Sequence, residues 1–209
     1  MNENISVICS ETPKERIPLL LNILKEYGIM QHKKVYVQSF DVKKDYYINH
    51  LISLIGKIDF KLVESYMFPI EVKSEKEKKI NSKSFILALE KLRNSDITIK
   101  DNKEFKKVTW LNYVFDLAST LTYQVIIIDN FNEFLERSEE SLECIMNRIE
   151  KYSKRYHAEI ILFMNEMDYH KFLNWKVSKV NDPFEFNYDP HHHSILGIER
   201  KDENHDNKE

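Results

Sequence analysis

The chain has 209 residues, enough for one domain with a substantial core, and a formal net charge of −3 at pH 7. This small negative charge argues against a protein that binds nucleic acid mainly through phosphate contacts, and no apolar run reaches the ~20 residues of a membrane helix. The chain has only 2 cysteines, which favours free thiols in a reducing compartment. We therefore expect a globular, cytoplasmic protein that does not act at a membrane.

Short apolar runs alternate with helical patterns along most of the sequence. Runs rich in β-branched residues predict buried strands, and amphipathic stretches between them predict helices. Such an alternation is typical of an α/β fold with a mostly parallel central sheet and helices on both faces. The strands predicted in this way span residues 5–9, 34–39, 97–99, 125–129 and 159–164, with two short strands at 184–186 and 194–198.

The helical segments are less sharply bounded than the strands. The first helix should begin close to Pro18, because proline is tolerated in the first turn of a helix, and end at Gly28 as a C-cap. The next helix should follow Asp41 and end at Gly56. The other predicted helices span about 60–66, 85–92 after a solvated charged segment at 71–82, 105–121 and 138–156, and regularity weakens after Tyr169.

No internal repeat or linker interrupts this pattern. We therefore predict a single domain over residues 1–198 and a disordered polar tail over residues 199–209.

Polar residues follow most of the predicted strands. Ligands of parallel sheets bind at the carboxyl ends of the strands, so the candidate site residues are those in the turn after Cys9 together with Asp41, Asp101, Asp129 and Asn165. Of these, Asp129 ends the longest β-branched run, which is how a buried strand delivers a carboxylate to a sheet edge. The plainer interpretation is that each is a polar residue closing a strand, with a structural role alone.

Five segments, in this order, resemble the RecA-type motor domain of DnaB-family replicative helicases. They are residues 5–22, 35–41 (VYVQSFD), 97–101 (ITIKD), 125–134 (VIIIDNFNEF) and 149–165, which ends in an Asn. The resemblance covers most of the chain and implies a RecA-like, P-loop NTPase-type fold. It implies that Asp129 matches the Walker B aspartate that holds Mg²⁺, that Asp41 stands where the family has its catalytic Glu, and that Asn165 stands where it has a sensor Gln.

The segment that matches the Walker A loop departs from the family. A phosphate loop needs glycines that turn backbone N–H groups toward the phosphates, and residues 10–17 contain none. Pro13 removes a donor, Arg16 falls where the family has Lys, and Ile17 falls where it has a hydroxyl. Glu15 would place a negative charge beside phosphates, at a cost on the order of 4 kcal/mol for a contact of about 4 Å. Ordinary MgATP binding is therefore not expected.

These departures favour a degenerate RecA-like domain that does not hydrolyse ATP and has no cofactor. It would be an accessory or regulatory protein-interaction module in DNA replication, with a replicative helicase or another replisome protein as its partner. Asp41, Asp129 and Asn165 would then be vestiges of a catalytic site, and Asp129 also the vestige of a metal site.

An active enzyme is the alternative. The chain would then be an ATP-dependent DNA helicase or ATPase subunit that binds MgATP through an unorthodox phosphate site made of Thr12, Lys14 and Arg16. Assembly into a homo-oligomer and binding of single-stranded DNA are also left open by the sequence.

Overall fold

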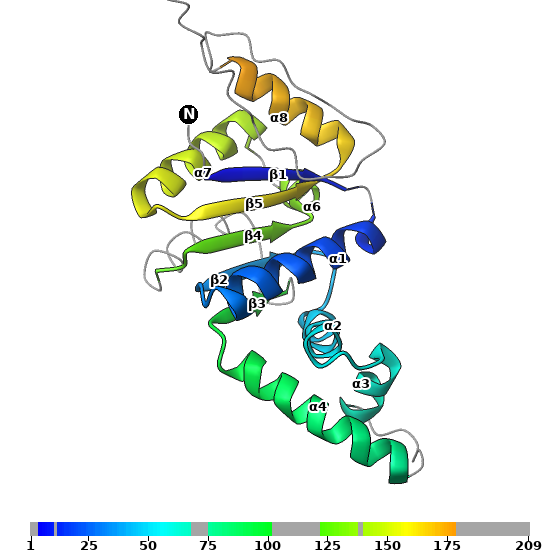
Figure 1. Cartoon of the computed structure of the whole chain (residues 1–209). Helices are drawn as coiled ribbons and strands as arrows, with labels where there is room; N and C mark the ends of the chain where they lie inside the picture. Colours follow the sequence, from blue (N-terminus) through cyan, green and yellow to red (C-terminus); the bar gives the residue numbers. More distant parts are fainter. Residues whose placement is uncertain (1–3, 11, 68–74, 102–121, 138–139, 179–209) are drawn as a thin grey trace, which may run out of the picture.

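The structure is a computed structural model, and it describes residues 4–10, 12–67, 75–101, 122–137 and 140–178 (Figure 1). The strands predicted at 184–186 and 194–198, the helix predicted at 105–121 and the tail predicted at 199–209 lie outside these residues. Within the described residues, no helix combines the length and the apolar character that crossing a membrane requires.

Five strands form one fully parallel sheet at the centre of the described part of the chain. They are β1 (Ile5–Cys9), β2 (Val35–Ser39), β3 (Ile97–Lys100), β4 (Val125–Asp129) and β5 (Glu159–Met164), in the order β1-β5-β4-β2-β3. The predicted strands and the parallel α/β architecture are thus confirmed. Because the strands run in one direction, all their carboxyl ends lie at the same edge.

Helices cover both faces of the sheet. One face is covered by α1 (Pro13–Leu24), the π-helix η1 (Lys25–Met30) and α2 (Lys44–Gly56), and the other by α6 (Phe131–Arg137), α7 (Leu142–Tyr156) and α8 (Glu166–Ser178). Two further helices, α3 (Phe60–Met67) and α4 (Glu75–Arg93), pack beside α2, and α4 lies away from the sheet (Figure 1).

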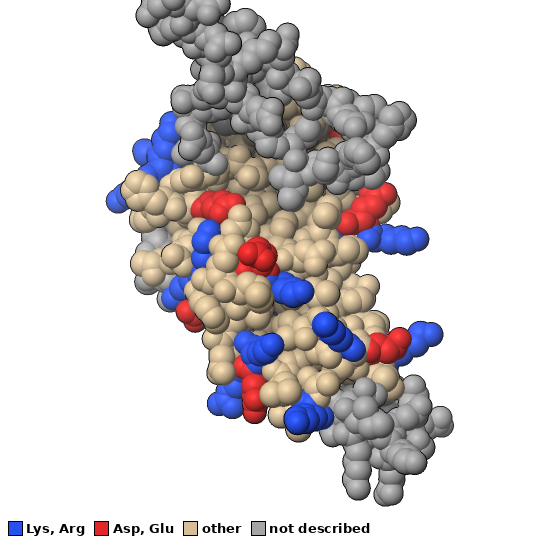
Figure 2. All heavy atoms as spheres, in the orientation of Figure 1, with Lys and Arg blue, Asp and Glu red and all other residues tan. Residues whose placement is uncertain are grey.

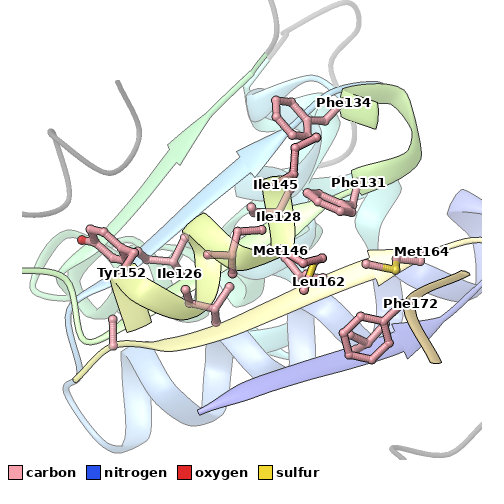
Figure 3. Close-up of a cluster of buried hydrophobic side chains, with 14 of the residues drawn as sticks. Ile126, Ile128, Phe131, Phe134, Ile145, Met146, Tyr152, Leu162, Met164 and Phe172 are labelled. Carbon is pink, nitrogen blue, oxygen red and sulfur yellow. The ribbon is translucent and has the colours of Figure 1, made fainter. Parts of the chain in front are cut away.

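The apolar run of β4 is explained by burial on both faces. Ile126 and Ile128 point into the cluster under α6, α7 and α8, where Figure 3 shows them beside residues of α7 such as Met146. Val125 and Ile127 point the other way, against α1 and α2. All four are 0% exposed. A strand with two dry faces needs apolar residues at consecutive positions rather than at alternate ones.

The predicted boundaries of the first helix were wrong at both ends. Thr12 is the N-cap and Pro13 the first helical residue, so Pro18 lies inside α1, where its missing N–H costs one helical hydrogen bond. Gly28 is not a C-cap, because the chain continues as a π-helix to Met30 and has no glycine with positive φ in the described residues. Gly28 is instead required by packing, since a Cβ there would lie 2.5 Å from Ile97 Cδ1.

The helices after β4 also differ from the prediction. The segment predicted as one helix from residue 138 contains α7 alone, which starts at Leu142 after the N-cap Ser141. The short helix α6 precedes it, with Phe131 and Phe134 buried against the sheet. The chain after β5 forms α8 as far as Ser178, although the sequence predicted weakening regularity in this stretch.

Candidate functional site

Three of the predicted site residues meet at the carboxyl edge of the sheet. β2 and β4 are neighbours, and Ser39 pairs with Asp129 in their register, so Asp41 lies close to the end of β4. β1 is not adjacent to β4, because β5 lies between them. The long side chain of Arg16, in the first turns of α1, bridges this separation and reaches both carboxylates.

Arg16 forms two ion pairs although it is almost completely buried. Its Nη2 donates a 2.6 Å hydrogen bond to Asp41 Oδ2, and its Nε lies against Asp129 Oδ1 as an ion pair rather than an aligned hydrogen bond. Arg16 is 3% exposed and Asp129 is 0% exposed. Burial alone lowers the pKa of an arginine, but the anions Asp129 and Asp41 outweigh it and raise the pKa of Arg16, which stays charged.

Asp129 is held by hydroxyl groups as well as by the guanidinium. Its Oδ2 accepts hydrogen bonds from the hydroxyls of Tyr47 in α2 and of Ser39, the latter at 3.1 Å. Burial raises the pKa of Asp129, while Arg16, Tyr47 and Ser39 act in the opposite direction by favouring the anion. Burial, followed by the charge of Asp129, raises the pKa of Tyr47, which therefore remains a hydrogen-bond donor at any ordinary pH.

The turn between β1 and α1 is short and uses its own hydrogen-bonding groups. Ser10 N–H donates to Met164 O, and Ser10 Oγ donates to Thr12 O. Thr12 caps α1, since its Oγ1 and its carbonyl oxygen both accept from Glu15 N–H. Of the residues predicted for an unorthodox phosphate site, Thr12 and Lys14 are thus exposed at the helix start, whereas Arg16 points inward.

Asn165 and Asp101 both cap helices. Asn165 Oδ1 accepts a 2.8 Å hydrogen bond from Asp168 N–H in the first turn of α8, and its own N–H donates to Asn132 Oδ1 at 2.7 Å. Asp101 Oδ2 accepts from Lys44 N–H at the start of α2. These bonds match the plainer interpretation of polar residues at strand ends.

An open polar pocket of about 230 Å³ lies at this edge, beside Arg16. The carboxylates of Asp41, Glu133 and Glu136 line it together with Asn130 and Asn165. Among the described residues, no group of three or more His, Cys, Asp or Glu is arranged to hold a metal ion.

Sequence analysis missed two partners in this site, Tyr47 and Ser39. The signal for Ser39 was its position next to Asp41 at the end of a predicted strand, and Tyr47 had been assigned only to the apolar side of its helix. The Asn132–Asp168 hydrogen bond, which links α6 to α8, was also missed, because neither helix was predicted.

No protein-family model matches this chain, and no curated protein sequence matches it at a significant level. Solved structures match with probability 1.00. One of them, an isolated ATPase domain, superposes with a TM-score of 0.62 at 16% identity, over 78% of this chain and 57% of that one. A DnaB-like replicative helicase, solved in a study of its interactions with primase, gives a TM-score of 0.61 at 16% identity, over 78% of this chain and 40% of that one.

A third structure, the flagellar accessory protein FlaH from Methanocaldococcus jannaschii, gives a TM-score of 0.54 at 12% identity, over 84% of this chain and 68% of that one. The chain thus spans less than two thirds of the length of the first two structures, and identities this low bear on the fold alone. The sheet order, the helices on both faces and these superpositions agree: the chain has the RecA-like fold found in the ATPase domains of DnaB-like helicases.

Proposed function

We propose that this chain is a RecA-like module that does not hydrolyse ATP and that acts in DNA replication through contacts with other proteins. The observation that carries the proposal is the position of Arg16. Its guanidinium lies buried between Asp41 and Asp129, the two carboxylates that an ATP-hydrolysing enzyme of this fold would need for the attacking water and the metal ion. Both carboxylates are thereby engaged within the chain.

The residues at this edge do not fit bound MgATP. At the start of α1, Pro13 has no N–H and the N–H of Glu15 is bonded to Thr12, so few backbone donors are left for a phosphate. The pocket of about 230 Å³ lies below the roughly 300–1,000 Å³ of small-molecule sites. Glu133 and Glu136 add negative charge to its lining, which repels a triphosphate.

Nucleotide titration tests the catalytic half of the proposal. Isothermal titration of the protein with MgATP and MgADP should give no binding tighter than about 100 µM, or about −5.5 kcal/mol. Binding tighter than this that disappears in Asp129→Ala would overturn it, with circular dichroism to show that the variant is folded. ATP turnover stimulated by single-stranded DNA and abolished by Arg16→Ala, but not by Lys61→Ala on the remote helix α3, would establish the alternative of an active helicase or ATPase subunit.

A replicative helicase is the partner that the fold suggests first, since domains of this fold associate with one another through their flanks. The purified helicase of the same organism should bind the immobilised chain, with an affinity that does not change when MgATP is replaced by MgADP in the presence of a fixed, pre-assembled ring. Absence of binding up to about 100 µM helicase, where the binding free energy is only about −5.5 kcal/mol, would contradict this choice of partner.

Binding of single-stranded DNA is a separate outcome, to be measured by fluorescence anisotropy at two salt concentrations. Contacts with phosphates would make the affinity fall steeply with salt. On the face shown in Figure 2, lysines and arginines are interspersed with acidic side chains rather than gathered in a patch, so we expect weak binding on this face.

A further inference from the structure

The carboxyl edge of the sheet has the groups of a cation site. Two carboxylates, Asp41 and Asp129, converge on one point, and the hydroxyls of Tyr47 and Ser39 orient the second of them. Such a pair of carboxylates needs a counter-charge, because an isolated buried carboxylate is costly. The counter-charge in this structure is the guanidinium of Arg16, which is 3% exposed.

We propose that Asp41 and Asp129 form a cation-binding site whose cation is supplied by the chain itself, as the guanidinium of Arg16. The site should therefore refuse an external cation in the natural protein and accept a free guanidinium ion when the Arg16 side chain is truncated. This inference deepens the proposed function and rests on it, because a nucleotide-binding edge would have to release Arg16 from both carboxylates.

The guanidinium also ties together segments that the sheet leaves apart. Arg16 belongs to α1, Asp41 follows β2 and Asp129 ends β4, while β5 separates β1 from β4. A planar fork with five N–H donors can reach two carboxylates at once, which the compact ammonium of a lysine does less well. The internal cation thus holds the start of α1 on the sheet edge, a role that a bound ligand would otherwise have.

Chemical rescue of Arg16→Ala tests the proposal. The melting temperature of the variant is measured in increasing guanidinium chloride, with NaCl keeping the ionic strength constant. At about ten times Kd the folding equilibrium constant rises about elevenfold, which corresponds to a gain of about 3–6 °C for a chain of this size. Urea, which has a similar planar shape without the charge, should give no gain.

Arg148→Ala is the matched control. Arg148 pairs with Glu140 on the surface, where the two side chains are 33% and 32% exposed, so its loss creates no buried cation site. Guanidinium should lower the melting temperatures of this variant and of the natural protein from the start. A folded Arg16→Ala that shows no gain, or an equal gain in Arg148→Ala or in urea, would overturn the proposal.

A second measurement does not depend on whether Arg16→Ala folds. The natural protein is titrated with Mn²⁺ and the bound ion is followed by electron paramagnetic resonance, and no site should be seen that Asp129→Asn removes. Mn²⁺ binding lost in Asp129→Asn would show that the carboxylates still take an external cation, and would overturn the proposal. Failure here or in the rescue leaves the absence of MgATP binding standing, whereas MgATP binding to the natural protein defeats the proposed function itself.

Discussion

Replacing Arg16 by methionine would test how strongly the buried ion pairs stabilise the fold. Methionine keeps much of the apolar stem of the side chain and removes the charge. Asp129 is 0% exposed and would be left without its counter-ion, whereas the side chain of Asp41 is 29% exposed and partly solvated. Removing one partner of a buried pair costs about 3–5 kcal/mol, so we expect the melting temperature to fall by about 6–20 °C.

The loss should depend on pH in a defined direction. Burial already raises the pKa of Asp129, and Arg16 opposes this rise, so the pKa must climb further in Arg16→Met. A carboxyl group with a higher pKa in the folded than in the unfolded chain stabilises the fold fully below the unfolded pKa, and this stability is lost as the pH rises through the folded pKa. The variant should therefore be closest to the natural protein at about pH 4 and weakest at about pH 8.

Urea unfolding followed by far-ultraviolet circular dichroism at several pH values measures both effects. Arg148→Met is the control, since an exposed ion pair contributes at most about 1 kcal/mol. If Arg16→Met loses no more than this control at the upper end of the pH range, or is no closer to the natural protein at low pH, then the ion pairs do not have the energetic role that their burial implies.

Three further substitutions probe the same edge and the packing beneath it. Tyr47→Phe removes one donor to the buried carboxylate and should lower the free energy of unfolding by about 1.5–3 kcal/mol, measured by urea unfolding. Gly28→Ala should cost about 1–3 kcal/mol through overpacking against Ile97. Adding Ile97→Val should recover part of that cost, and additive losses in the double variant would contradict the steric explanation. Asn165→Ala removes the cap that accepts from Asp168 N–H and should cost about 0.5–2 kcal/mol, whereas Asn165→Asp, which keeps the acceptor, should cost less.

The sheet could be predicted from sequence because its strands are buried on both faces. Segments such as 125–129 and 159–164 then read as unbroken β-branched and apolar runs, and their carboxyl ends mark the site edge. Asp129 was found in this way before its neighbours were known.

The partners of Asp129 could not be predicted with the same ease. Strand order is a tertiary property, so nothing local indicates that β5 separates β1 from β4 or that a side chain as long as Arg16 spans the distance. The helix boundaries failed for local reasons: Thr12 and Pro13 form a better start than Pro18 does, and α8 buries only a few of its side chains, so its periodicity is weak.

The helices beside α2 have their own small core, and this divides the molecule energetically. Ile52, Ile58, Val63 and Ala88 form a cluster that contains no strand residue. Few apolar contacts therefore resist separation of α3 and α4 from the rest, and such regions open at lower free energy than the global transition. Amide protons of residues 83–93 should accordingly exchange with solvent earlier than those of β4, through an opening that leaves the sheet intact.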